Sequence, residues 1–216
     1  MKPLLIILIL SLCLSCGSDK ELQLAEIQHS EIKEVLDVSP AYIFYNTKAE
    51  DSVELNKQNL ISTTNWLVNI DKRLTLQQAI PVVIGLQEKK RNASHKKKGV
   101  KNYFTAFNPE VKNLRFIEFT KVHYHVNTTI EAYVKTLDDQ AEVLTFNRND
   151  VTFQEKQLTV DAFVNRLKTA PNQGHVFVLN FENQLSFQEY LHIKDLLLTV
   201  KNTAVLIHTN EFIYKS

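Results

Sequence analysis

The stretch Trp66-Leu-Val-Asn-Ile-Asp-Lys-Arg-Leu-Thr-Leu-Gln-Gln-Ala-Ile80 occurs a second time, with changes, as Phe177-Val-Leu-Asn-Phe-Glu-Asn-Gln-Leu-Ser-Phe-Gln-Glu-Tyr-Leu191. The apolar positions coincide, and Asn69, Leu74 and Gln77 are matched by identical residues 111 positions later. Each copy has the pattern of a buried strand, an acidic residue at its end, a Thr or Ser that can cap a helix, and the helix itself. The chain is therefore predicted to contain one α+β unit twice.

Two further pairs of segments occur in the same order. Residues 111–120 match residues 200–209, and a weaker match joins 42–55 to 143–153. The first of these matches has an offset of 89 residues instead of 111, which predicts an insertion of 22 residues in the first copy. We place this insertion near 88–110.

Hydrophobic periodicity gives the second copy the order β-β-α-β-α-β, and the first copy the same order without its first helix. Thr159, Thr75 with Gln78, and Ser186 with Glu189 are predicted to cap the helices. We therefore expect an α+β fold of two tandem β-β-(α)-β-α-β units with mixed sheets. The expected boundaries are a signal peptide over 1–15, a lipidated spacer over 16–38, a first unit over 39–128, a linker over 129–140 and a second unit over 141–216. Residues 22–36 are expected to be partly helical, and Pro40 to begin the folded body.

A short basic start and an apolar run precede Cys16. The run, over 4–12, is too short to span a bilayer and is typical of a cleaved signal peptide. The sequence Leu14-Ser15-Cys16 resembles a bacterial lipobox, in which a peptidase cuts before the Cys and the thiol carries a diacylglycerol. Cys13 departs from that pattern, since Leu is usual there, and the alternative is an ordinary signal peptide with a chance Cys. The polar residues 17–21 resemble the export tails of Bacteroidota lipoproteins, so we expect an outer-membrane protein that faces the periplasm or the cell surface.

Composition argues against several classes of function. The net charge of +1 argues against nucleic acid as a partner. Both Cys lie at or before the expected cleavage site, so the mature chain would have no disulfide and no thiol chemistry. Only four Gly occur, and the motifs GxGxxG, GxxxxGK[ST], GxSxG and HExxH are absent from the sequence. The sequence therefore predicts no cofactor and no catalytic residue.

The second copy, over about 141–212, resembles the periplasmic domain of the ExbD/TolR family. The likeness lies in the apolar strand over 176–182, the helix start over 185–190 and the last strand over 200–207. The resemblance implies a small α/β module that pairs with itself and contacts other envelope components, so two fused copies would pack as an intrachain pseudo-dimer. Family members keep a transmembrane helix with an Asp that helps to couple proton flow. This chain departs from that pattern, and proton coupling is not carried over.

A basic run in the expected insertion is a candidate contact for anionic lipid, lipopolysaccharide or an acidic protein face. The aromatic segment over 103–107 lies close to it in sequence and favours a contact site. The alternative is a solvated loop. The candidate residues are Lys89, Lys90, Arg91, Lys96, Lys97 and Lys98.

His123 and His125 are weak candidates for a metal site, because residues two apart on a strand face the same side. A third ligand would be needed, from His95, Glu118 or His208. The alternative is two half-exposed polar residues leaving a strand, and no metal is predicted.

Asp71 and Glu182 end equivalent strands and could form an acid–base pair. Because each precedes a helix N-terminus, where carboxylates are favoured, we expect them to be structural. Asp51-Ser52-Val53 resembles the O-glycosylation motif of Bacteroidota, with Ser52 as the acceptor. The sequon that begins at Asn92 is one that most bacteria do not use.

The sequence favours a lipid-anchored envelope protein without catalytic activity, acting in binding or as an accessory subunit of an outer-membrane or periplasmic complex. Its expected partners are the membrane, through lipid on Cys16, and an envelope protein. The alternatives are an enzyme acting on envelope glycans and a structural lipoprotein that binds peptidoglycan. A glycan cleft would expose aromatic side chains, but the single Trp, Trp66, begins an apolar strand.

Overall fold

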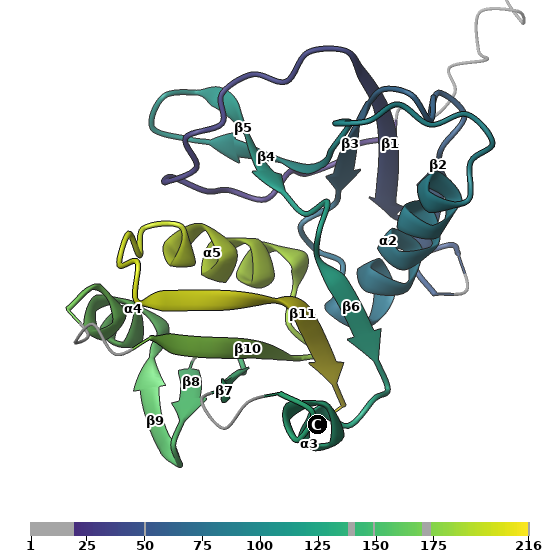
Figure 1. Ribbon diagram of the computed structural model, residues 1–216. Helices are drawn as coiled ribbons and strands as arrows, with labels where there is room; N and C mark the ends of the chain where they lie inside the picture. Colours follow the sequence, from purple (N-terminus) through teal and green to yellow (C-terminus); the bar gives the residue numbers. More distant parts are fainter. Residues whose placement is uncertain (1–19, 50, 138–140, 149, 170–173, 216) are drawn as a thin grey trace, which may run out of the picture.

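The structure is a computed structural model that describes residues 20–49, 51–137, 141–148, 150–169 and 174–215 (Figure 1). Cys16 and the expected signal peptide lie outside these residues. The first sheet contains β1 (Val38–Tyr45), β2 (Val53–Asn56), β3 (Asn65–Ile70), β4 (Asn102–Asn108) and β5 (Asn113–Glu118). The second contains β6 (His123–Val126), β7 (Ala141–Phe146), β8 (Asp150–Phe153), β9 (Lys156–Thr159), β10 (His175–Glu182) and β11 (Val205–Tyr214). The helices are α2 (Leu76–Arg91), α3 (Ile130–Val134), α4 (Val160–Lys168) and α5 (Phe187–Leu197).

Both sheets are mixed, and the predicted α+β class is confirmed. The strand order is β2-β1-β3-β4-β5 in the first sheet and β6-β11-β10-β7-β8-β9 in the second. In the first sheet β1 is antiparallel to β2 and parallel to β3, which is parallel to β4. In the second, β7 is antiparallel to β8 and parallel to β10, which is parallel to β11. The series β2-β1-β3-β4 and β8-β7-β10-β11 thus have the same order and the same directions.

The arrangement of the strands differs from the sequence alignment at one point. In the second sheet β11 lies beside β10. In the first sheet the corresponding place beside β3 is taken by β4 and not by β5. The aromatic segment over 103–107, expected in an insertion, is the interior of β4 and is mostly buried. The first Val-Lys-Asn tripeptide lies in the turn that enters β5 at Asn113, and the second lies in the loop before β11. Short loop sequences repeat easily, so this match aligned β5 with β11.

The boundary between the halves also differs from the expected position. β6, expected in the first unit, pairs in parallel with β11 of the second sheet, with Asn210 opposite His123. The expected linker over 129–140 contains α3, whose Ile130 packs with Val178 and Phe212 on the second sheet. The chain therefore passes to the second half before residue 123.

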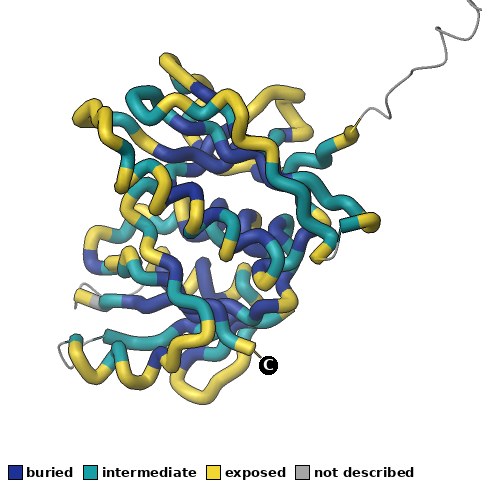
Figure 2. The backbone as a smooth tube through the Cα atoms, turned by 90° about the vertical axis from the view of Figure 1, so that its right-hand side faces the viewer, coloured by how far each residue is buried: buried dark blue, intermediate teal, exposed yellow. Residues whose placement is uncertain are grey.

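The larger of two clusters of buried side chains in the described part of the chain runs through both halves. Buried segments, dark blue in Figure 2, accordingly occur in both. α5 lies between the two sheets and buries side chains on several faces (Figure 1). The ring of Phe104 on β4 stacks on Phe119 at 3.9 Å and meets the rings of Phe187 and Tyr190 on α5 edge-on, at 5.2 and 6.3 Å. Because these aromatic contacts join β4 to α5, the two halves share one core.

The helices α2 and α5 begin where the sequence predicts. The side chain of Gln78 accepts a hydrogen bond from the main-chain N–H of Thr75 at 2.9 Å. At α5 the Glu189 carboxylate accepts from the N–H of Ser186 at 2.7 Å, and the Ser186 hydroxyl accepts from the N–H of Glu189 at 3.2 Å. Both capping boxes are thus confirmed.

Main-chain N–H groups in the first turn of each helix donate to carbonyl groups just before the other helix. The N–H of Leu76 donates to the carbonyl of Leu185 at 2.8 Å, and the N–H of Phe187 donates to the carbonyl of Leu74 at 2.7 Å. The first N–H groups of a helix have no partner inside the helix. Each half therefore supplies acceptors that the helix of the other half lacks.

A second pair of bonds extends this contact. The N–H of Gln77 donates to the carbonyl of Asn183 at 2.9 Å, and the N–H of Gln188 donates to the carbonyl of Lys72 at 3.2 Å. In both pairs the donors are 111 residues apart, and so are the acceptors. The contact is therefore reciprocal, as it is between two copies related by a two-fold axis.

We call the segment over 20–37 the strap. It was expected to be partly helical, but it is extended and packs on the body. Ala25 and Ile27 are buried, the N–H of Ile27 donates to the carbonyl of Phe107 at 3.0 Å, and the N–H of Phe107 donates to the carbonyl of Ala25 at 2.9 Å. β3 pairs with β4 only as far as Phe104. The strap therefore occupies the part of the β4 edge that β3 leaves open, and the folded body begins well before Pro40.

The strap is held by the carboxylate of Asp195 on α5, which is 1% exposed. The main-chain N–H groups of Gln28, His29 and Ser30 donate to its two oxygens at 2.8–3.1 Å, and the His29 imidazole Nδ1 lies 2.9 Å from one of them. Hydrogen bonds to a carboxylate are stronger than neutral ones, and this carboxylate is shielded from water.

No helix within the described ranges is long and apolar enough to cross a membrane.

We expect Asp195→Ala to lower the free energy of unfolding by about 3 kcal/mol, because three main-chain N–H groups, that of buried Ser30 among them, lose their acceptor. Urea unfolding measures this loss. His29→Ala is the matched control, since it leaves the main-chain bonds in place and should cost about 1 kcal/mol or less. Equal losses from the two variants would contradict the assigned role of the carboxylate.

Candidate functional site

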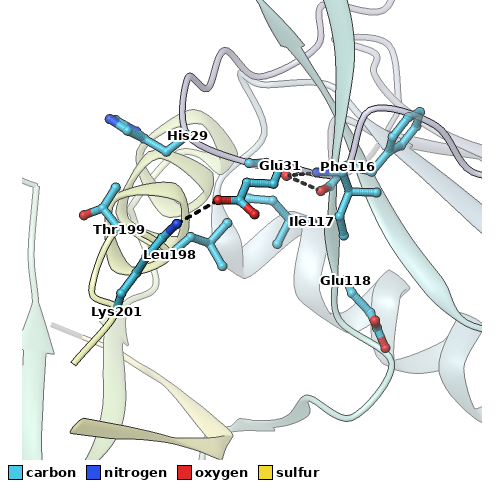
Figure 3. Close-up of a pocket in the computed structure, with 10 residues that line it drawn as sticks. His29, Glu31, Phe116, Ile117, Glu118, Leu198, Thr199 and Lys201 are labelled. Atoms are coloured by element: carbon cyan, nitrogen blue, oxygen red, sulfur yellow. Dashed lines mark hydrogen bonds and ion pairs between the residues drawn. The ribbon is translucent and has the colours of Figure 1, made fainter. Parts of the chain in front are cut away.

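A groove of about 490 Å³ opens between the strap, β5 and the end of α5 (Figure 3). We call it the junction groove. Its lining residues are His29, Ser30, Glu31, Ile32, Phe116, Ile117, Glu118, Leu198, Thr199 and Lys201.

The strap covers the edge of β5 on one side of the groove. The N–H of Phe116 donates to the carbonyl of Ile32 at 3.1 Å, and the hydroxyl of Ser30 donates to the carbonyl of Phe116 at 2.6 Å. Opposite them, the side chain of Leu198 follows α5 and is 49% exposed. The groove thus combines a covered strand edge with an exposed apolar side chain.

Each ionisable side chain that lines the junction groove has an oppositely charged neighbour. Glu31 pairs with Lys201 at 2.9 Å, Glu118 pairs with Lys101 at 2.7 Å, and His29 lies against the Asp195 carboxylate. The Lys201 ammonium, by hydrogen bonding and by its charge, holds the pKa of Glu31 below its usual value. A general base needs a free lone pair within reach of its substrate. The charges that line the groove are therefore locally balanced.

A second, smaller pocket of about 170 Å³ lies at the end of α2, and we call it the basic pocket. Four of the six predicted basic contact residues line it, and Lys89 and Lys98 do not. The cations that line it are Lys90, Arg91, Lys96 and Lys97, beside Ser62, Gln87, Val100, Asn102 and Thr120.

Lys90 is the most enclosed of these cations. Its ammonium donates to the carbonyl of Lys101 at 3.0 Å and to the side-chain oxygen of Asn102 at 2.8 Å, and it lies 4.9 Å from the centre of the Trp66 ring. Burial lowers the pKa of Lys90 to about 8. Sequence reasoning missed Trp66 as its neighbour, because the two residues are joined only by the packing of α2 on β3.

Asp71 is held by Arg73 and Gln23, which lie outside α2, and its role stays a prediction. The side chain is fully buried, and the Arg73 guanidinium donates to both carboxylate oxygens at 2.8 and 2.7 Å. The N–H groups of Arg73 and Gln23 donate as well, at 3.0 and 3.3 Å. Burial alone would raise the pKa of Asp71, but these hydrogen bonds outweigh it and the pKa is lowered. Glu182, at the equivalent strand end, is half-buried.

The two weak metal candidates differ in their surroundings. His123 is exposed, whereas the ring of His125 stacks on Phe212 at 4.6 Å and lies 2.6 Å from the side-chain oxygen of Asn210. The N–H of Asn210 donates to Nδ1 of His208 at 3.0 Å. In the part of the chain that the structure describes, no three His, Cys, Asp or Glu side chains are arranged to hold a metal ion.

Ser52 lies in the turn before β2, has a φ of 55° and is half-buried. It lines a polar pocket of about 590 Å³ together with Gln77, Gln78 and Gln184. Gln78 donates to the carbonyl of Asp51 at 3.0 Å, so the turn that carries Ser52 is bound to the start of α2. O-glycosylation of Ser52 stays a prediction.

A buried polar network joins α5, β6 and β11, and the sequence did not reveal it. Glu211 is 0% exposed, pairs with the Lys194 ammonium and accepts a hydrogen bond from the Tyr190 hydroxyl at 2.7 Å. The hydroxyls of Tyr190 and Tyr124 are 3.1 Å apart. Burial, with the charge of Glu211, raises the pKa of both tyrosines well above the usual value. Both phenols therefore keep their protons and bind as neutral groups.

An irregularity in β11 places Glu211 in this network. Opposite β10, Phe177 is paired with Ile207 and Leu179 with Glu211, so one residue of β10 lies between these pairs and three of β11. The two extra residues of β11 bring Glu211, instead of Thr209, opposite Leu179. In the sequence, Glu211 follows the polar residues His208, Thr209 and Asn210, so nothing there marked it as buried.

No protein-family model, no curated protein and no solved structure matches this chain.

We expect Lys194→Met to destabilise the protein by about 3–5 kcal/mol, because it leaves the Glu211 carboxylate buried and unpaired. Combining it with Glu211→Gln should recover about half of that loss, since the amide still accepts from Tyr190 and carries no charge. A double-mutant cycle from chemical denaturation measures the coupling. Additive losses would show that the two charges do not depend on each other.

We expect Asp71→Asn to lower the free energy of unfolding by about 2 kcal/mol at pH 7. Because folding lowers the pKa of Asp71, its stabilising contribution is present above the unfolded value of 3.8 and is lost as the pH falls through the lower folded value. The difference between the variant and the parent chain should therefore shrink below about pH 4. Thermal unfolding across pH 2–7 tests this, with Glu182→Gln as the control expected to have a smaller effect at pH 7.

Proposed function

We propose that this chain is a lipid-anchored envelope protein that binds without catalysis, as an accessory subunit of an outer-membrane or periplasmic complex. The observation that carries this proposal is the junction groove. Its ionisable side chains are paired with opposite charges, while Leu198 at its mouth stays exposed. Exposed apolar surface beside polar and charged groups is the composition of a protein-binding surface.

The proposed tether follows from the sequence Ser15-Cys16 and from the position of the strap. Lys20 is the first residue that the structure describes, four residues after Cys16. Four residues span at most about 14 Å when fully extended. A lipid on Cys16 would therefore hold the start of the strap near the membrane surface.

We further propose that the two halves descend from one duplicated unit. The equal strand order β2-β1-β3-β4 and β8-β7-β10-β11 supports this, and so does the reciprocal contact between the helix starts. An intrachain pair of this kind agrees with what the resemblance to ExbD/TolR domains implies. That resemblance itself rests on the sequence pattern.

The proposed partner is another envelope protein that contacts the junction groove. Protein interfaces combine an apolar centre with a polar rim. Leu198 and Ile32 supply apolar surface here, and the exposed pair of Glu31 with Lys201 supplies the rim. The groove lies where the strap, the first sheet and α5 meet, so a partner bound there would contact both halves.

The experiment introduces a photo-cross-linking amino acid at Leu198 in cells that make the full chain. Leu206 is the matched control, because it is also an exposed leucine, at 59%, and does not line the groove. We expect one reproducible protein adduct from position 198 and none from position 206, identified by mass spectrometry. Equal labelling at both positions would contradict the groove as the contact site.

The anchor is tested separately by Cys16→Ser. We expect the parent chain in the membrane fraction, and the variant in the soluble fraction or retained with its uncleaved signal. Metabolic labelling with a fatty acid should mark the parent chain alone. A labelled variant would contradict Cys16 as the lipidated residue.

A further inference from the structure

The basic pocket has more positive charge than its acidic neighbours balance. Lys97 pairs with Asp37 at 2.9 Å. Among the described residues, Arg91 and Lys96 have no acidic partner, and Lys90 bonds only to uncharged oxygens. Three cations thus converge on one pocket without a counter-charge from the described part of the chain.

Two side chains of the basic pocket also have a hydrogen-bond donor without an acceptor among the described residues. An ammonium group has three N–H bonds, and Lys90 uses two of them. The hydroxyl oxygen of Thr120 accepts from the N–H of Asn102 at 2.9 Å, and its own O–H has no acceptor among the described residues. A ligand that accepts several hydrogen bonds at once would satisfy both groups.

The enclosure of Lys90 makes an anion favourable there. Its ammonium is partly removed from water over the Trp66 ring. Desolvation penalises a charge, and a bound anion removes that penalty by pairing with it. Arg91 adds a planar fork of donors, which suits a tetrahedral oxyanion, and Lys96 adds a second point charge.

We propose that the basic pocket binds a phosphate monoester, with Lys90 and Thr120 as inner donors and Arg91 and Lys96 as the cations at its mouth. The pocket volume of about 170 Å³ limits the bound part to a small group of this kind. The phosphate could belong to a soluble molecule or to a lipid headgroup. The inference names the class of ligand that the basic residues would bind. It does not depend on the junction groove or on lipid at Cys16.

The test uses the full chain carrying Cys16→Ser, so that no covalent lipid contributes, and glycerol 3-phosphate as the soluble probe. The pocket variant is Arg91→Gln with Lys96→Gln. The matched control is Lys89→Gln with Lys98→Gln, which removes the same charge from the same run outside the pocket. In titrations followed by NMR, we expect the pocket variant to bind at least about tenfold more weakly than the parent chain, and the control to bind within about twofold of it.

A second readout reports on Lys90 itself. The charged groups around it are Arg91, Lys96 and Lys97 in the pocket, with Asp37 paired to Lys97 and Glu118 paired to Lys101. A phosphate monoester is already largely doubly charged above about pH 6, so its own charge changes little from pH 7 to pH 9. Lys90 loses most of its charge over that interval, so binding should weaken as the pH rises to 9. Lysine carbon chemical shifts should show a higher pKa for Lys90 when the probe is bound.

Two lipid arms identify the source of the phosphate. Phosphatidylcholine vesicles with phosphatidic acid present a phosphate monoester, and vesicles with phosphatidylglycerol present an anionic diester. Binding to the first and not to the second, lost in the pocket variant, assigns the site to a lipid headgroup. Binding of glycerol 3-phosphate without either vesicle assigns it to a soluble phosphate.

Two results would overturn the proposal. One is the absence of binding to glycerol 3-phosphate and to both vesicles by a chain whose thermal unfolding shows that it is folded. The other is an equal loss in the pocket and control variants, which would mean diffuse attraction to a basic surface. Neither result bears on the cross-linking at Leu198, so this inference and the proposed function can fail separately.

Discussion

The unpaired N–H groups at the start of a helix are the constraint on which this structure depends. α2 and α5 each meet that constraint with a capping side chain and with carbonyl groups from the other half of the chain. The donors Leu76 and Phe187 are buried, so water does not replace those carbonyls. Neither half can bury its helix start alone without losing hydrogen bonds, which makes the pair of halves the stable unit.

The strap extends this dependence to the first described residues. Its main chain pairs with β4, and its N–H groups surround the carboxylate of Asp195 on α5. One segment thus contacts the first sheet and the helix of the second half. The junction groove exists because the strap passes over β5 at Phe116 and leaves the space beside Leu198 open.

Sequence reasoning succeeded where the determining interactions are local. The caps at Thr75 and Ser186 depend on residues three positions apart, and the strands β3 and β10 are mostly apolar runs. It failed where the partner is distant. The extended form of the strap depends on Asp195, more than 160 residues away, and nothing in the strap's own periodicity shows this. Among the candidate sites, the basic run could be predicted from its charged residues. The contact of Lys90 with the Trp66 ring could not, because it arises only from tertiary packing.

The anchoring of the strap also has a consequence for the order in which the chain acquires its structure. Ser30 is bound to Asp195, which is 165 residues later, so the earliest described residues cannot reach their final place until α5 has been synthesised and has folded. Contacts of such long sequence separation form late, because the intervening chain must first be brought together. The strap is thus made before the rest of the described chain and becomes fixed to the body after the helix that holds it.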